Sequence, residues 1–214
     1  MRRTLNIWSR WAGIPWAAAT IVLVLAAGIL YVSTGTAAGE SKAPATTATD
    51  ISLGPAGAKV VMVEYSDFQC QYCAQYASLL SPLREKYKDR VLFVFRFFPL
   101  ENHPFGMVSA QAAYAAYLQG KFWEMHDLLF TNQQDWSTAA APETYFEAYA
   151  SALGLDLEKF RTDYAAQTTQ DYILGEKAGG KQAGVEHTPW FIVNGTIVTP
   201  RTTAEFESLW QVGS

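Results

Sequence analysis

The sequence predicts an α/β fold, in which helices flank a mixed β-sheet, with an inserted helical subdomain and a preceding transmembrane helix. Three observations lead to this prediction. A strand, a helix and a second strand follow one another over residues 60–98, and a helix crossing between two strands makes them parallel. A helical stretch of about 101–185 comes next, and two short strands around an Asn-Gly pair then complete the sheet.

The N-terminal residues have the pattern of a membrane-spanning segment. Residues 13–32 are nearly all apolar, which is long enough for a helix to cross the hydrocarbon core of a bilayer. Arg2, Arg3 and Arg10 precede this run, so residues 1–12 are expected in the cytoplasm and the rest of the chain outside it. The first prediction is therefore a single-pass protein of the cell membrane.

A cleaved signal peptide is the alternative, because the small residues at 34–38 offer a cleavage site. Both alternatives place the folded domain in an extracytoplasmic, oxidising compartment. Residues 33–59 are mostly Ala, Thr, Gly, Ser and Pro, which predicts a flexible linker. The folded domain is expected over residues 60–214, with its start no earlier than Ile51.

The elements of the folded domain follow from the spacing of its apolar residues. An apolar, β-branched run at 60–65 predicts a buried strand, and residues 71–88 have helical spacing. Asn194-Gly195 between two apolar runs is a strong hairpin signal, and Thr202 with Glu205 forms a capping box for a last helix. The remaining predictions are strands at 91–98, 190–193 and 196–198 and helices at 104–119, 121–130, 142–153, 156–167 and 169–183.

Composition and charge exclude several classes of protein. Of the 214 residues 50% are hydrophobic and 17% are charged, which is typical of a packed domain and not of a disordered chain. The net charge is −4, and three of the 16 basic residues lie before residue 11, so the rest of the chain is more acidic still. An acidic domain repels phosphate backbones, and we therefore expect no nucleic-acid partner.

The only two cysteines, Cys70 and Cys73, lie where the first strand turns into the first helix. A structural disulfide is disfavoured, because closing so short a loop stabilises a fold far less than closing a long one. A zinc site is disfavoured too, because His103, His126 and His187 are scattered and there is no second cysteine pair. A redox dithiol is favoured: the helix N-terminus stabilises a thiolate at Cys70, and Cys73 lies one turn further on to resolve a mixed disulfide.

Two other positions are candidates for the same site. Glu64 is the only acid in the first strand; if it is buried, its carboxyl has a raised pKa and can move the proton of Cys73. The alternative is a glutamate at a strand edge that faces water. Thr188-Pro189 stands directly before a strand, where an ordinary trans proline is also tolerated.

The histidines have simpler interpretations, with one exception. His103 is interpreted as a residue that caps or precedes a helix, and His126 as a packed or surface residue of an amphipathic helix. His187 lies two residues before Pro189, so it tunes the dithiol if the proline loop faces the cysteines.

Four separated segments resemble those of the DsbA-like thiol:disulfide oxidoreductases of the thioredoxin superfamily. They occur in the right order and the resemblance covers residues 51–212; it looks closest to the membrane-anchored, monomeric branch. The four segments are 63–73 (VEYSDFQCQYC), 96–100 (RFFPL), 119–127 (QGKFWEMHD) and 188–195 (TPWFIVNG).

The resemblance implies a thioredoxin-like fold with the helical block as its insertion, and a role for each candidate residue. Cys70 is the attacking cysteine, Cys73 is the resolving cysteine, and Glu64 is the buried acid beneath them. Pro189 is cis and faces the dithiol, and the Thr188 backbone pairs with an extended substrate chain.

The dipeptide Gln71-Tyr72 departs from the family pattern. The best-known oxidases carry Pro-His at these two positions, and relatives often have Pro-Tyr. Neither Gln71 nor Tyr72 adds a positive charge beside Cys70, so we expect a less extreme oxidant. The predicted substrate-binding residues are therefore Thr188, Gln71, Tyr72 and His187.

The predicted function is the donation of disulfides to unfolded or partly folded exported polypeptides, by a monomer that needs no cofactor besides its Cys70–Cys73 disulfide. A membrane quinone-coupled thiol oxidase is the expected partner that restores the disulfide. Two alternatives stay open. One is a reductase that uses the same dithiol with a reducing partner, and the other is a tethered chaperone or peptide-binding module in which the dithiol is incidental.

Overall fold

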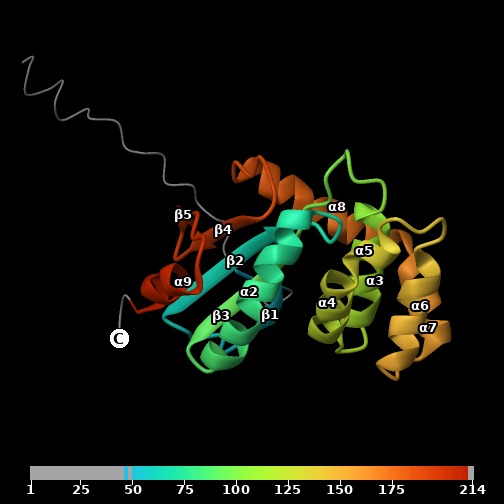
Figure 1. The fold of residues 1–214 in the computed structure, drawn as a ribbon, viewed down its shortest axis with the longest axis horizontal. Coiled ribbons are helices and arrows are strands. Elements are labelled where there is room, and N and C mark those ends of the chain that lie inside the picture. The colour runs from blue at the N-terminus through green and yellow to red at the C-terminus, as the bar shows by residue number, and fades with distance from the viewer. Residues whose placement is uncertain (1–45, 48–49, 212–214) are drawn as a thin grey trace, which may run out of the picture. The chain divides into compact units, whose positions relative to one another are not determined.

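The computed structural model describes residues 46–47 and 50–211 (Figure 1). The predicted N-terminal segment 1–12, the membrane anchor 13–32 and most of the linker lie outside these residues. Within the two described ranges, no helix is both long enough and apolar enough to cross a bilayer.

A five-stranded mixed sheet forms the centre of the described domain, with the strand order β1-β3-β2-β4-β5. β2 and β3 are parallel, as the strand–helix–strand pattern predicted, and the other neighbouring strands are antiparallel. Residues 194 and 195 both have positive φ, as a two-residue hairpin turn between β4 and β5 requires. The strands are β1 (Ile51–Leu53), β2 (Val60–Ser66), β3 (Val91–Phe97), β4 (Trp190–Val193) and β5 (Thr196–Val198).

Helices pack on both faces of this sheet. α2 (Gln71–Tyr87) crosses from β2 to β3 and shares a hydrophobic cluster with α9 (Thr203–Trp210) on one face. On the opposite face α8 (Gln167–Gln182) comes so close that a Cβ at Gly180 would lie 2.9 Å from the rings of Tyr65 and Phe98. Glycine at position 180 therefore allows α8 to lie directly on the sheet.

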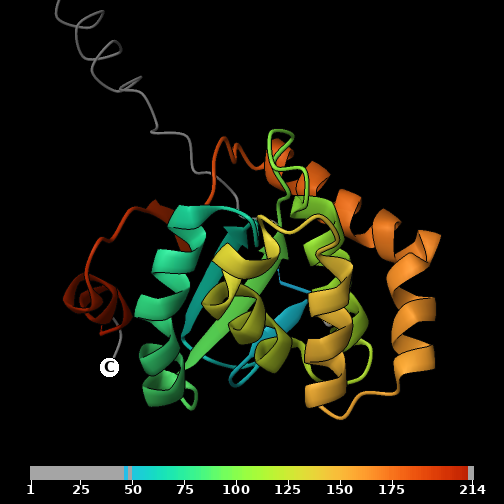
Figure 2. The same ribbon diagram turned by 45° about the vertical axis from the view of Figure 1, so that its right-hand side comes forward.

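The helical insertion runs between β3 and β4 and packs next to the β1 edge of the sheet (Figures 1 and 2). Its core combines the buried alanines of α3 with aromatic side chains, and the same cluster includes Cys70 and Cys73. The two cysteines therefore lie where the insertion meets the sheet. Besides α8, the insertion contains α3 (Gly106–Tyr117), α4 (Phe122–Thr131), α5 (Gln133–Trp136), α6 (Glu143–Ala152) and α7 (Leu157–Ala165).

Two short elements were not predicted. β1 lies inside the range 33–59 that we expected to be linker, and it begins at Ile51, the earliest start that we had allowed for the folded domain. β1 is a strand because it pairs with β3, and the buried ion pair between Asp50 and Arg96, with N···O distances of 3.0 and 3.2 Å, secures it. α5 has only four residues, which is too short to show a helical period.

Candidate active site

Cys70 is the N-cap residue of α2, directly after the turn that follows β2. Its Sγ donates to the carbonyl oxygen of Thr188 across 3.6 Å, and the Thr188–Pro189 peptide bond is cis. Cys70 is 5% exposed and Cys73 is 0% exposed, so Cys70 is the sulfur that a second molecule can reach. The fold thus places the first cysteine of the pair against the residue that precedes the proline.

The turn before Cys70 is organised by Asp67, whose side chain is completely buried. Its carboxylate accepts hydrogen bonds from the backbone N–H of Gln69 (2.7 Å), the backbone N–H of Leu100 (2.7 Å) and Nδ1 of His103 (2.8 Å). The Asp67 backbone carbonyl accepts from the N–H of Cys70 at 3.0 Å. His103 therefore supports the active-site turn, and does not simply precede a helix as we had interpreted it.

Gln133 connects the helical insertion to the cysteine turn. This buried residue of α5 donates through Nε2 to the carbonyl oxygens of Phe68 (2.7 Å) and Cys70 (2.9 Å). Sequence reasoning missed both Gln133 and Asp67. The only local signal was an aspartate at the strand-to-helix turn, a residue type that accepts hydrogen bonds from nearby backbone N–H groups.

The pKa of Cys70 is lowered to about 6 in this environment. A hydrogen bond from the Cys73 thiol is the largest cause; the Thr188 side chain and the backbone N–H groups of Cys73 and Tyr72 add to it, and burial opposes them. The sequence predicted a stabilised thiolate and attributed it to the helix N-terminus. The helix contributes through those two N–H groups, but the neighbouring thiol contributes more.

Cys73 and Glu64 are buried and favour their protonated forms. Burial raises the pKa of Cys73 well above that of an ordinary thiol, and burial raises the pKa of Glu64 to about 7. The Ser66 hydroxyl lowers the pKa of both groups, which indicates that it lies near each of them. Glu64 faces the interior and not the water at a strand edge, and its Oε1 has no hydrogen-bond partner among the described residues.

We predict that the reduced protein shows a thiolate titration with a midpoint near pH 6 when its far-ultraviolet thiolate absorbance is followed. The pKa of Cys70 in the folded protein lies below that of a free cysteine, which is about 8.5. The thiolate therefore contributes fully to the stability of the reduced protein above about pH 8.5, and this contribution is lost as the pH falls through about 6. Removing the Cys73 thiol by Cys73→Ala should move the midpoint upward. A wild-type midpoint near 8.5 would contradict the described site.

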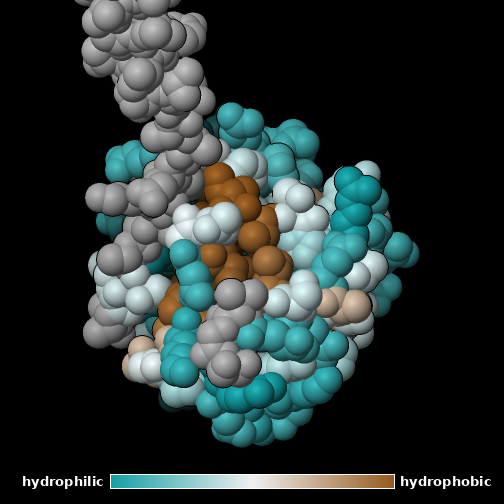
Figure 3. Space-filling view, turned by 90° about the vertical axis from the view of Figure 1, so that its left-hand side faces the viewer, coloured by the Kyte–Doolittle hydropathy of each residue, from teal (hydrophilic) through white to brown (hydrophobic). Residues whose placement is uncertain are grey.

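Two clefts that share Tyr72 open at the active site, and one of them contains Cys70. The first, called here the apolar groove, has a volume of about 450 Å³ and is lined by Tyr72, Tyr76, His187, Thr188, Pro189, Trp190, Phe191, Ile197, Val198 and Thr199. Tyr72, one of the predicted substrate-binding residues, is 66% exposed there. Figure 3 shows hydrophobic residues gathered on the side of the molecule that carries β4, β5 and α9.

The second cleft, of about 760 Å³, contains Cys70 and is lined mainly by polar residues, including Gln71 and His103. The predicted substrate-binding residues are thus divided between the two clefts, since Gln71 lies in this cleft and His187 in the apolar groove. The ring of His187 contacts that of Trp190, with centroids 4.8 Å apart, and no hydrogen bond in the described part of the chain joins it to either cysteine.

His126 is fully buried among aromatic rings, and burial lowers its pKa to about 4. It is a packed residue, which was one of the two interpretations of its position. In residues 46–47 and 50–211, no three His, Cys, Asp or Glu side chains cluster in a way that could hold a metal ion.

A parallel strand–helix–strand core, a Cys-x-x-Cys pair at a helix N-terminus and a facing cis-proline define a thioredoxin-fold protein with a dithiol site. Residues 46–211 match the thioredoxin family, and the chain belongs to that family. The predicted thioredoxin-like fold is confirmed by this match, and solved structures described as DsbA-type proteins share that fold.

Three of those structures illustrate the likeness. Wolbachia pipientis alpha-DsbA1 has 19% identity and a TM-score of 0.71, covering 81% of this chain and 94% of that one. A thioredoxin-like oxidoreductase from Silicibacter pomeroyi DSS-3 has 25% identity and a TM-score of 0.65, covering 81% and 95%. Bacillus subtilis BdbD in its oxidised form has 20% identity and a TM-score of 0.67, covering 76% and 91%.

The curated relatives are longer proteins. A region of the Na(+)/H(+) antiporter NhaA 3 of Salinispora tropica is 39% identical to this chain over 143 residues, which is 66% of this chain and 21% of that protein. The Na(+)/H(+) antiporter NhaA of Herminiimonas arsenicoxydans is 35% identical over 142 residues, or 66% and 22%. The chain therefore spans about a fifth of the length of these relatives.

Proposed function

We propose that this protein is a thiol:disulfide oxidoreductase that donates its Cys70–Cys73 disulfide to exported polypeptides. One observation carries the proposal. Cys70 lies at the start of α2 beside the Thr188 carbonyl, and its thiolate is stabilised chiefly by a hydrogen bond from the Cys73 thiol. That hydrogen bond exists only in the dithiol, so it favours the reduced protein over the disulfide.

The reaction begins when a substrate thiolate attacks Sγ of Cys70. A new S–S bond forms between substrate and Cys70, the Cys70–Cys73 bond breaks, and Cys73 leaves with the electron pair. Because burial raises the pKa of Cys73, this sulfur takes up a proton, and Glu64, with a pKa of about 7, is the buried acid that can supply it. A second substrate thiolate then attacks the substrate sulfur, and Cys70 leaves as a thiolate.

The lowered pKa of Cys70 supports donation because it stabilises the dithiol relative to the disulfide. With a pKa of about 6, roughly nine tenths of the Cys70 thiols are ionised at pH 7, which stabilises the dithiol by about 1.4 kcal/mol. For this two-electron couple, about 1.4 kcal/mol corresponds to about 30 mV. The effect is modest, in keeping with the absence of a positive charge in the Gln71-Tyr72 dipeptide.

The substrate we propose is an unfolded or partly folded chain. The carbonyl of Thr188 beside Cys70 can pair with an extended backbone, a recognition mode that reads main chain more than sequence. The apolar groove next to it offers aromatic contacts for hydrophobic side chains that only an unfolded chain exposes.

The proposed location is the outer side of a membrane. The apolar run at 13–32 and the three arginines before it support a single-pass anchor, and similarity to part of proteins described as antiporters supports a place at a membrane. A quinone-coupled thiol oxidase in that membrane is the partner proposed to restore the disulfide, and the protein is proposed to act as a monomer.

The direction of the reaction is tested by the equilibrium reduction potential of the full 214-residue chain in glutathione redox buffers. We expect a value between those of thioredoxin, about −270 mV, and DsbA, about −120 mV. A value at or below that of thioredoxin would contradict donation and favour the reductase. Unchanged function in cells after replacement of both cysteines would instead favour the chaperone alternative.

A further inference from the structure

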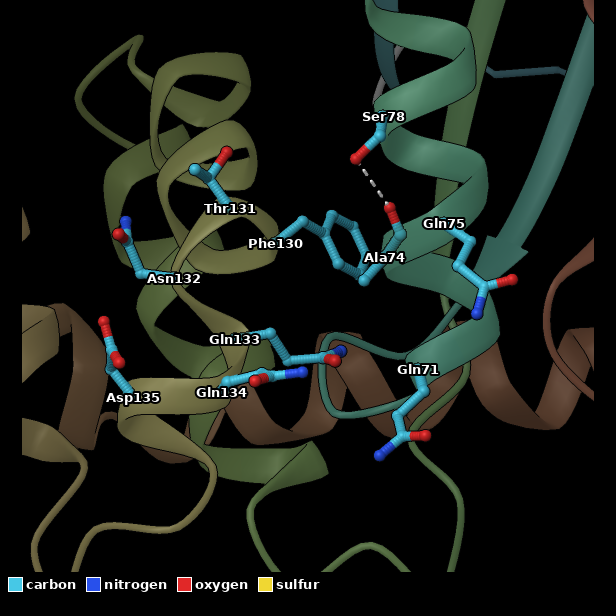
Figure 4. A pocket seen from close by; sticks show the side chains of 10 residues that line it. All are labelled: Gln71, Ala74, Gln75, Ser78, Phe130, Thr131, Asn132, Gln133, Gln134 and Asp135. Atoms are coloured by element: carbon cyan, nitrogen blue, oxygen red, sulfur yellow. Dashed lines mark hydrogen bonds between the residues drawn. The ribbon is translucent and has the colours of Figure 1, made fainter.

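A cleft lined by side-chain amides runs between α2 and the α4–α5 segment, and it shares no lining residue with the apolar groove (Figure 4). It has a volume of about 570 Å³, and Asp135 is the only charged residue that lines it. We call it the amide cleft, and define it by its five amide-bearing residues: Gln71 and Gln75 from α2, and Asn132, Gln133 and Gln134 from the other wall.

Most of these amides have hydrogen-bonding capacity to spare. The side chains of Gln71, Gln75 and Gln134 make no hydrogen bond with any described residue. Gln133 uses Nε2 to hold the cysteine turn, and its Oε1 accepts no hydrogen bond from the described part of the chain. In Figure 4, Gln133 and Gln134 extend from α5 toward α2. The cleft therefore presents several donors and acceptors, on the exposed side chains of Gln71, Gln75 and Gln134 and at Oε1 of the buried Gln133.

The amide cleft continues to the reactive sulfur. The neighbouring cleft that contains Cys70 shares Gln71, Gln133, Gln134 and Asp135 with it. The cleft that contains Cys70 also shares Tyr72 with the apolar groove, so a polypeptide joined to Cys70 through a mixed disulfide would have two different clefts next to its cysteine.

We propose that the amide cleft binds the polar, extended segment on one side of the substrate's target cysteine. An amide side chain both donates and accepts, as each peptide unit of an extended backbone does, so glutamines suit main-chain recognition without a fixed sequence. Walls with no lysine or arginine give no preference for acidic segments. Ala74 and Phe130 add apolar surface to the lining, and the volume of about 570 Å³ is available to a bound segment.

This inference rests on the proposed function and adds a substrate preference to it. The preferred cysteine lies at a boundary in the unfolded chain, with hydrophobic residues on one side for the apolar groove and polar residues on the other for the amide cleft. Such a boundary is common where a buried strand ends in a loop.

The test uses the oxidised 214-residue chain and synthetic peptides with a single cysteine. In the first pair, the full peptide has a hydrophobic arm before the cysteine and a Ser-Gly-Asn arm after it, and the truncated peptide lacks the Ser-Gly-Asn arm. In the second pair, the full peptide has the Ser-Gly-Asn arm before the cysteine and the hydrophobic arm after it, and the truncated peptide again lacks the Ser-Gly-Asn arm. The second-order rate constant for mixed-disulfide formation is measured for each peptide. We expect one order of arms to react about tenfold faster than its truncated partner, as two or so net hydrogen bonds would allow.

Two variants locate that preference in the cleft. The double variant Gln75→Ala/Gln134→Ala should remove most of the rate advantage that the polar arm gives. The matched control is Gln182→Ala, which replaces an exposed glutamine of α8 outside the amide cleft and should keep that advantage. Gln134→Lys should make a peptide with a Glu-rich arm react about two- to fivefold faster than one with a Lys-rich arm, the range of an exposed ion pair. All substituted residues are exposed, and thermal unfolding checks that each variant folds.

Failure of this inference and failure of the proposed function give different results. If wild-type protein reacts equally fast with full and truncated peptides, or if the double variant keeps the advantage, the amide cleft is not a substrate site, although exchange itself stands. If the wild-type disulfide reacts with no peptide thiol, the proposed function is overturned and this inference falls with it.

Discussion

Replacement of Cys70 by serine is expected to reduce thiol–disulfide exchange to the uncatalysed background rate. A hydroxyl group cannot form the mixed disulfide, and Cys73 cannot replace it, because Cys73 is 0% exposed and burial keeps its thiol protonated. The measurement is the rate of disulfide formation in a reduced, unfolded model protein, with catalytic amounts of the chain and an excess of oxidant.

Cys73→Ser is the informative partner of that variant. It keeps Cys70 but removes the resolving thiol, so it should accumulate as a mixed disulfide when a disulfide-bonded substrate is added. The mass of the trapped complex should fall to that of the free protein on addition of dithiothreitol. Two results with Cys70→Ser would refute the assignment of the two roles: full exchange activity, or a trapped mixed disulfide formed through Cys73.

Asp67→Ala is expected to give the largest loss of stability near the site, about 2–4 kcal/mol in the free energy of unfolding. The substitution leaves two backbone N–H groups and the His103 ring without their acceptor. A fully buried donor without a partner costs about 1–3 kcal/mol, and these three donors are only partly buried, so water offsets part of their combined cost. Since the same turn holds the Cys70 backbone, exchange activity should fall as well. Chemical denaturation of the reduced protein measures the effect.

Two comparisons separate the role of Asp67 from a general effect of removing charge. Asp67→Asn keeps one acceptor oxygen and should lose less stability than Asp67→Ala. Asp89→Ala, which removes an exposed carboxylate from the turn after α2, should stay within about 0.5 kcal/mol of wild type. Equal losses for Asp67→Ala and Asp89→Ala would show that the buried carboxylate does not organise the turn.

Most of the sheet and of the helical insertion was predictable because their signals are local. The apolar run at 60–65 became β2, the spacing at 71–88 became α2, and Asn194-Gly195 became the turn of a hairpin. The capping box was also confirmed, since the N–H of Glu205 donates to the Thr202 hydroxyl at 3.2 Å. β1 was missed because three residues carry no period, and pairing with β3 makes them a strand.

The site was predictable where its residues are adjacent in sequence, and less so where they are not. Cys70 and Cys73 could be recognised by their spacing and position, and Glu64 as an acid in an apolar strand. Gln133 lies 63 residues from Cys70 in an element of four residues, so no local pattern could indicate it. His103 was placed correctly before a helix, but its bond to Asp67 depends on how the loop after β3 folds back.

The sequence by itself determined the order of the elements and the presence of a dithiol at a helix start, because hydrophobic period and cysteine spacing are properties of neighbouring residues. Only the tertiary structure decided how that dithiol is tuned. The Thr188 carbonyl beside the sulfur, the hold of Gln133 on the cysteine turn and the amide cleft all depend on atoms brought together from distant segments, and the burial that keeps the Cys73 thiol protonated depends on the packing around it. Such contacts arise from packing, which no local pattern in the chain encodes.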